Sequence, residues 1–168
     1  MFMTTLESRT DPGPNAGFSL RVTGTSAARE PQTLTQAVQS FVRDTAEDSL
    51  RPIAAPTAGR AWQPPVLLAL LANCYAREIF GSVEIERLMQ RDADFRQLCG
   101  QEFPEARSLR RFRRENRSIL ESCLGAALRF LDGQRPPGRP SLSEAKLVAE
   151  TKRRLEMAMF MDSMDIEV

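Results

Sequence analysis

The stretch from Pro64 to Phe80, PPVLLALLANCYAREIF, decides the fold, because its apolar residues fall on nearly every side of a helix. The two prolines suit the first helical turn, where a missing N–H leaves no hydrogen bond unmade. The apolar run from Val66 to Ala76 is about half the roughly 20 residues that a membrane-spanning helix needs. The pattern therefore predicts a buried central helix over Val66 to Phe80, ended by Gly81, and no transmembrane segment.

The segments on both sides of this helix also have helical patterns. Apolar residues recur at i, i+3 and i+4 from Leu34 to Leu50, with Thr33 as the N-cap. A third predicted helix is capped by Ser82 and has an inward stripe of Val83, Ile85, Leu88 and Met89. A short fourth helix follows from Asp92 to Gly100, with Phe95 and Leu98 inward. The last two are a long helix from Leu109 to Leu131, capped by Ser108 and closed by Gly133, and one opened by a capping box of Ser141 and Glu144 and ending near Met164. No stretch alternates with a period of two, so the predicted fold class is all-α.

Composition divides the chain into five parts. Residues 1–32 are rich in Thr, Ser, Gly and Pro and predict a disordered arm, because such a segment cannot bury enough apolar surface to offset its ordering entropy. The other parts are an amphipathic helix and linker (33–60), a compact helical domain (61–133), a proline-rich linker (134–140), and a C-terminal helix and tail (141–168). The predicted architecture is a compact helical bundle between an N-terminal arm and a C-terminal helix.

The composition also excludes several kinds of site. The 168 residues include no histidine, which rules out Ser-His and Cys-His nucleophilic catalysis and the usual zinc spacings. No glycine-rich phosphate loop is present. We therefore expect no catalytic residue, no metal site, no cofactor and no small-molecule substrate. Cys74, Cys99 and Cys123 are expected to be small buried apolar residues rather than redox groups.

The charge balance bears on partners and compartment. The net charge is +1, from 23 Lys and Arg against 22 Asp and Glu, so the chain as a whole attracts neither nucleic acid nor anionic lipid. The N-terminus lacks the basic region, apolar block and cleavage site of a secretory signal. We expect a cytoplasmic protein with no membrane partner, associated with the nucleoid if it binds DNA. Any attraction to a polyanion must come from a local excess of charge.

That local excess lies between Arg107 and Arg117, where six arginines fall within eleven positions. They are Arg107, Arg110, Arg111, Arg113, Arg114 and Arg117. On a helix that begins after Ser108, the apolar stripe faces inward and leaves Arg110, Arg113, Arg114 and Arg117 on the outer face, with Arg107 and Arg111 assisting from the turn and flank. Guanidinium groups bind phosphate oxygens and guanine edges, and one α-helix fits a major groove. The alternative is a solvated face in a chain whose basic residues are nearly all arginine.

The segment from Trp62 to Arg114 resembles a known family. The matching residues are Trp62, Pro64 and Pro65, the Leu-rich helix that ends in Tyr75 and Ala76, then Ser82, Ile85, Glu86 and Arg87, then Phe95, Arg96, Leu98 and Gly100, and finally Pro104, Ser108, Leu109, Arg111, Phe112 and Arg113. In order and spacing they are similar to the N-terminal, InsH-type domain of bacterial insertion-sequence transposases of the DDE class. The chain departs from that pattern at Glu105 and Ala106, where many relatives have an Asp-His or Asn-Tyr pair.

The resemblance implies a helical, helix-turn-helix-like module that binds duplex DNA at the ends of a mobile element, centred on Arg107 to Arg117. In that family a downstream RNase-H-like domain carries the metal-binding carboxylates. The 28 residues after Pro140 are too few for such a domain, so we expect a DNA-binding module without a catalytic domain, not an enzyme. Asp162, Asp165 and Glu167 are expected to form a solvated tail rather than a metal site.

Two other interpretations stay open. The arginine face could pair with acidic proteins in a non-enzymatic interaction module, or the chain could be a degenerate transposase fragment. The four methionines near the C-terminus, Met157, Met159, Met161 and Met164, are typical of adaptable interaction surfaces. Because odd positions dominate, we expect these four not to share one helical face. A homodimer through the last helix remains a further hypothesis.

Overall fold

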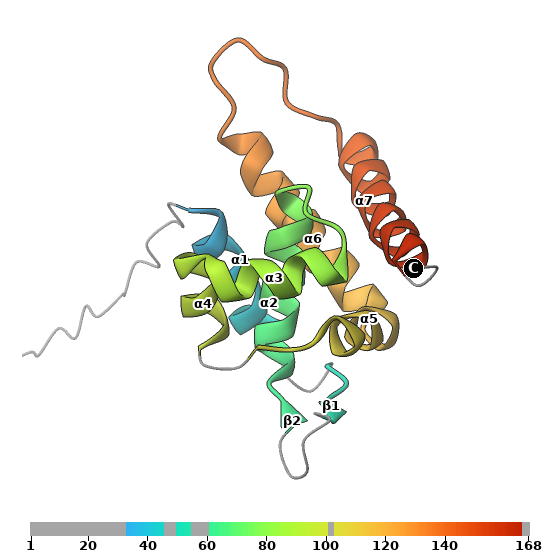
Figure 1. The fold of residues 1–168 in the computed structure, drawn as a ribbon. Coiled ribbons are helices and arrows are strands. Elements are labelled where there is room, and N and C mark those ends of the chain that lie inside the picture. The colour runs from blue at the N-terminus through green and yellow to red at the C-terminus, as the bar shows by residue number, and fades with distance from the viewer. Residues whose placement is uncertain (1–32, 46–49, 55–60, 101–102, 166–168) are drawn as a thin grey trace, which may run out of the picture.

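The computed structural model describes residues 33–45, 50–54, 61–100 and 103–165, and the predicted disordered arm lies outside them. The predicted all-α fold is confirmed, since this part of the chain contains seven helices and one short antiparallel pairing of two-residue strands (Figure 1). The elements are α1 (Leu34–Asp44), β1 (Ile53–Ala54), β2 (Ala61–Trp62), α2 (Pro64–Ala76), α3 (Ser82–Arg91), α4 (Ala93–Cys99), α5 (Ala106–Glu115), α6 (Arg117–Gly133) and α7 (Glu144–Met164). No helix among the described residues has the length and apolar character needed to cross a bilayer.

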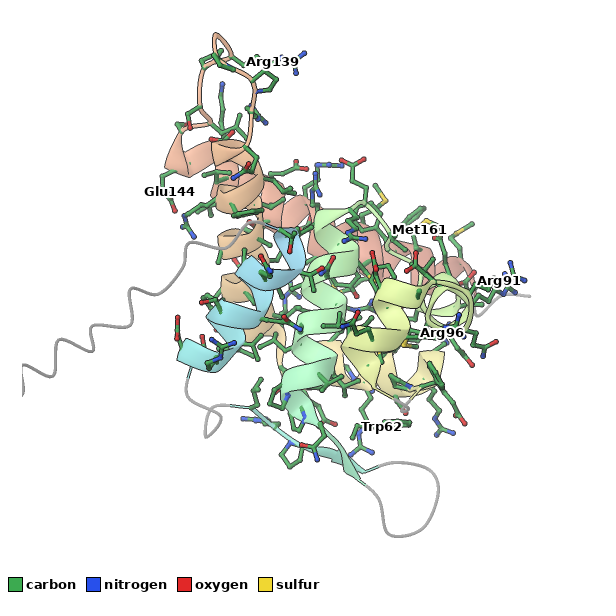
Figure 2. The ribbon with its side chains drawn as sticks, turned by 90° about the vertical axis from the view of Figure 1, so that its left-hand side faces the viewer. Trp62, Arg91, Arg96, Arg139, Glu144 and Met161 are labelled. Atoms are coloured by element: carbon green, nitrogen blue, oxygen red, sulfur yellow. The ribbon has the colours of Figure 1, made fainter. Side chains whose placement is uncertain are left out.

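Helix α2 is the centre of the core, as predicted. Every residue from Leu67 to Ala76 is buried, and α1, α4, α5 and α6 pack around the helix (Figure 2). The predicted end at Phe80 is wrong, because α2 stops at Ala76 and the chain turns through Glu78 in a left-handed conformation (φ 65°). A guanidinium from α7 binds the last carbonyl groups of α2, which stabilises this early end.

Helix α1 belongs to the same core. Thr33 caps it as predicted, in a capping box in which Thr33 Oγ1 accepts from Gln36 N (3.2 Å). The buried face of Leu34, Val38 and Val42 packs against α2 and α6. The helix ends at Asp44, earlier than the apolar pattern predicts.

The pair α3 and α4 follows the predicted pattern except at one cap. The short helix predicted after Asp92 is present as α4: Asp92 caps it by accepting from Asp94 N (2.8 Å) and Phe95 N (3.3 Å), and Gly100 ends it, as predicted, with a positive φ of 64°. Ser82, the predicted N-cap of α3, is instead the first helical residue and is buried. The backbone N–H and the hydroxyl of Ser82 both donate to the carboxylate of Asp162 in α7. The spacing of residues near Ser82 cannot reveal this long-range contact.

The long helix predicted from Leu109 to Leu131 is wrong, because the chain breaks at Asn116 into α5 and α6. Asn116 leaves helical geometry (φ −120°, ψ 29°) and pairs with the backbone of Arg51: its Oδ1 accepts from Arg51 N (2.7 Å), and its Nδ2 donates to Arg51 O (3.1 Å). Helix α5 starts at Ala106, so Ser108 is a buried helical residue and not a cap. The break turns α5 away from the axis of α6 (Figure 1).

Helix α7 runs alongside α6 and ends beside α5 (Figure 1). Its N-cap is Ser143, which accepts from Lys146 N (3.4 Å). The predicted capping box at Ser141 is therefore wrong, because the hydroxyl of Ser141 donates to Asp132 at the end of α6. Leu147, Leu155 and Ala158 join the common core, so α7 packs as an integral helix.

All three cysteines are buried and unpaired, as predicted. Burial raises the pKa of the Cys99 thiol to about 11 and that of Cys123 to about 12. Burial also raises the pKa of the Cys74 thiol, which lies in α2. All three thiols are therefore protonated at neutral pH and act as apolar packing groups.

Candidate functional site

The structure divides the six arginines of the candidate site by burial. Arg113 is only 7% exposed: its Nη1 donates to the hydroxyl of Tyr75 (2.9 Å), and its Nη2 donates to the carboxylate of Asp162. The prediction that Arg113 faces outward is wrong. The partners from α2 and α7 each accept one hydrogen bond from the guanidinium, and the carboxylate of Asp162 compensates in part for removing its charge from water. Burial raises the pKa of Tyr75 to about 12, so its hydroxyl stays protonated at neutral pH.

Asp162 joins three helices at one point. Its carboxylate accepts from Ser82 N (2.8 Å) and Ser82 Oγ (2.8 Å) at the start of α3, and from Arg113 of α5. Arg110 Nε lies 3.5 Å from Asp162 Oδ1, the oxygen that also accepts from Ser82 N. A negative charge at a helix N-terminus is favourable because the orphan N–H groups there carry partial positive charge. Asp162 is only 4% exposed, so the prediction that it belongs to a solvated tail is wrong.

Arg154 of α7 contacts the C-terminal end of α2, as Asp162 contacts the N-terminal end of α3. Its Nη1 donates to the carbonyl oxygens of Tyr75 (2.9 Å) and Ala76 (2.8 Å), and its Nη2 donates to Glu78 Oε1 (2.9 Å). A positive charge is favourable at a helix C-terminus. Helix α7 thus places a cation at the end of α2 and an anion at the start of α3. These two contacts fix the corner between α2 and α3.

The exposed arginines form the second group. Arg107, Arg114 and Arg117 are exposed and have no carboxylate partner among the described residues. Arg111 is also exposed but pairs with Glu115, with Arg111 Nε 2.7 Å from Glu115 Oε1. Arg107, Arg111 and Arg114 follow the i, i+4, i+7 spacing of one helix face. The result is a row of cations, most of them without a counter-charge, along the outer side of α5.

Packing holds α5 rigidly behind this row. Leu109 and Phe112 are fully buried in the core on its inner side. Glu86 of α3 caps its start, since Glu86 Oε2 accepts from Ala106 N (2.9 Å). Glu86 is one of the residues that resemble the transposase family pattern, and this hydrogen bond gives it a structural role. Guanidinium groups on a fixed rod can contact successive phosphate oxygens without a large ordering cost.

The sequence did not indicate Arg154 and Asp162 as important residues, although α7 carries a signal. The buried residues of α7 are Leu147, Thr151, Arg154, Leu155, Ala158 and Asp162. Two charges thus fall inside a helical stripe of otherwise apolar or small residues, which indicates buried ion pairs. No group of acidic or cysteine side chains in the described ranges could hold a metal ion.

We predict that Asp162→Asn lowers the free energy of unfolding by about 3–5 kcal/mol, because it leaves the Arg113 guanidinium buried without a counter-charge. The measurement is urea denaturation followed by circular dichroism. The matched control is Asp165→Asn, which removes an exposed carboxylate of the same helix end. Equal losses for the two variants would contradict the assigned role of Asp162.

Comparison with known families supports the resemblance seen in the sequence. The family model described as Transposase domain (DUF772) matches residues 26–115, which include α1 to α5. Comparisons with curated proteins and with solved structures gave no match. The family match covers more than half of the chain and ends with α5, so α6 and α7 lie beyond it. The protein belongs to the transposase-domain family DUF772.

Proposed function

We propose that the protein binds duplex DNA through the exposed arginines of α5 and the start of α6. The observation that carries the proposal is the set of three cations, Arg107, Arg114 and Arg117, that have no carboxylate partner in the described part of the chain. Clustered cations without counter-charges attract a polyanion, because phosphate contacts release condensed counterions. Membership of a transposase-domain family supports a DNA partner.

The six candidate arginines have different proposed roles. Arg107, Arg111, Arg114 and Arg117 would contact phosphates or base edges, and α5 would be the helix presented to the major groove in a helix-turn-helix-like arrangement. Arg113 does not reach DNA in this proposal, because its guanidinium is committed to Tyr75 and Asp162. Arg110 is intermediate, half-buried beside Asp162. The proposal contains no cleavage or joining step.

The test is the salt dependence of affinity for one blunt duplex, measured by fluorescence anisotropy. Each phosphate contact contributes about −0.9 to the slope of log affinity against log salt, so four contacts give a slope of about −3.6. We predict that Arg107→Gln and Arg114→Gln each weaken binding and reduce the steepness by about 0.9. Neither substitution breaks an ion pair among the described residues, so both variants should keep the native fold.

The matched control is Arg139→Gln, which removes the same charge from the loop at the far end of the molecule from α5 (Figures 1 and 2). This control should leave the affinity and the salt slope unchanged. If wild-type protein does not bind the duplex at low salt, the DNA proposal fails. Equal effects of Arg139→Gln and Arg114→Gln would show that binding depends on overall charge and not on α5.

We propose a second property, self-association through α7. Phe160, Met161 and Met164 are 58%, 38% and 53% exposed, and with Met157 they follow an i, i+3, i+4, i+7 spacing. The four methionines do not share one face, as expected, because Met159 lies toward Arg117, but Met157, Met161 and Met164 do fall on one side of α7. Two copies of such a stripe are self-complementary in a two-fold dimer.

Sedimentation equilibrium measures this association directly. We predict that the wild-type protein dimerises and that Phe160→Ser makes it monomeric, because the substitution removes the most exposed apolar group of the stripe. Phe103→Ser is the matched control, since Phe103 is an exposed phenylalanine outside α7. A wild-type monomer at every concentration tested would contradict the dimer.

A further inference from the structure

A pocket of about 380 Å³ opens between α5, the start of α6 and the C-terminal half of α7. Its walls include four arginines, Arg110, Arg113, Arg114 and Arg117, and one carboxylate, Asp162. The volume lies within the range of small-molecule sites. No sequence motif indicated this pocket, because its walls come from three helices that meet only in the folded chain.

The charge of the pocket is not balanced by its own residues. Four guanidinium groups face one carboxylate, which leaves a net charge of +3 on the lining. The carboxylate already accepts hydrogen bonds from Ser82 and Arg113. Arg114 has no carboxylate partner in the described ranges. An anion entering the pocket would therefore supply the missing counter-charge.

Two donors in the pocket also lack good acceptors. Arg110 Nε is buried and has no hydrogen-bond partner among the described residues, and it lies 3.5 Å from a carboxylate oxygen of Asp162. Arg117 is exposed, and its Nη1 contacts the thioether of Met159 at 3.9 Å. A buried donor without a partner is costly, which applies to Arg110 Nε, whereas the thioether that Arg117 contacts is only a weak acceptor. Oxygen atoms of a bound ligand would satisfy both donors better than the protein does.

The α7 side of the pocket has an apolar part. Leu155 and Met159 form this part, and Asp162 and Ser163 of the same helix also line the pocket. Methionine makes favourable contacts with aromatic rings, and its flexible chain adapts to their shape. The pocket thus combines a cationic side for a compact anion with an apolar side for a flat ring. Inorganic phosphate alone would leave the apolar wall unused.

We propose that this pocket binds the phosphate monoester of a mononucleotide unit. The phosphate lies among Arg110, Arg114 and Arg117, and the base lies against Leu155 and Met159. Such a group has two sources, a free nucleoside monophosphate or the 5′-terminal nucleotide of a DNA strand. The inference goes beyond duplex binding: it shares Arg114 and Arg117 with the proposed duplex contacts, whereas Arg107 is outside the pocket and Leu155 and Met159 are not duplex contacts.

Isothermal titration calorimetry on the full chain tests the proposal with six probes: AMP, inorganic phosphate, adenosine, a 5′-phosphorylated dinucleotide, the same dinucleotide with a 5′ hydroxyl, and a blunt duplex with 5′ hydroxyl ends. We expect AMP to bind more tightly than phosphate, and adenosine and the 5′-hydroxyl dinucleotide not to bind. A phosphorylated dinucleotide that binds more tightly than AMP identifies the strand end as the source. Equal or weaker binding identifies the free nucleotide. No binding of either phosphorylated nucleotide overturns the proposal.

Single substitutions locate the site. Arg114→Gln and Arg117→Gln should each weaken AMP binding by roughly tenfold to a hundredfold, the effect of losing one charge-assisted hydrogen bond. Arg107→Gln, on the same helix but outside the pocket, should leave AMP binding unchanged. Unchanged thermal unfolding temperatures would establish that the variants fold. AMP binding that survives the double substitution of Arg114 and Arg117 overturns the proposal.

The titration with the blunt duplex distinguishes a failure of this inference from a failure of the proposed duplex binding. If the duplex does not bind while AMP does, the duplex proposal fails and the pocket stands. If the duplex binds and no phosphorylated nucleotide does, the pocket proposal fails and the duplex proposal stands.

Discussion

The carboxylate of Asp162 accepts hydrogen bonds from the backbone and hydroxyl of Ser82 and from the guanidinium of Arg113, so one side chain of α7 holds both the start of α3 and the middle of α5. Arg154 makes the opposite contact with the end of α2. Each charge meets a helix end of opposite polarity and also pairs with an opposite charge, Asp162 with Arg113 and Arg154 with Glu78, and together these contacts reduce the cost of burying the two charges. Helix α7 lies beyond the family match, yet it fixes the helix that carries the exposed cations.

Much of the fold follows from local patterns. The apolar sequence of α2, the N-cap at Thr33 and the short helix that follows Asp92 each depend on residues within a few positions, and the structure confirms all three. The errors occur where a distant residue decides. Asn116 breaks a continuous helical pattern because it pairs with the backbone of Arg51, 65 positions away. Spacing along one helix contains no information about such a contact.

The candidate site shows the same division. Helical spacing placed Leu109 and Phe112 inward, and both are buried. Of the four arginines that spacing placed outward, Arg114 and Arg117 are exposed, Arg110 is half-buried and Arg113 is buried. Spacing could not show that Arg113 turns into the core, because its exposure depends on a carboxylate 49 positions away on α7. The pocket between α5 and α7 escaped prediction for the same reason. Charges inside the buried stripe of α7 were the available signal.

The central claim is that α5 uses its exposed arginines for DNA while Arg113 serves the fold. Side-chain Nε–Hε resonances of arginine, followed by NMR during titration with a short duplex, test this claim residue by residue. The account predicts that the resonances of Arg107, Arg114 and Arg117 shift on binding, while those of Arg113 and Arg154 stay unchanged because both guanidinium groups are buried and held by hydrogen bonds within the protein. A shift at Arg113 with no change at the three exposed arginines would contradict it.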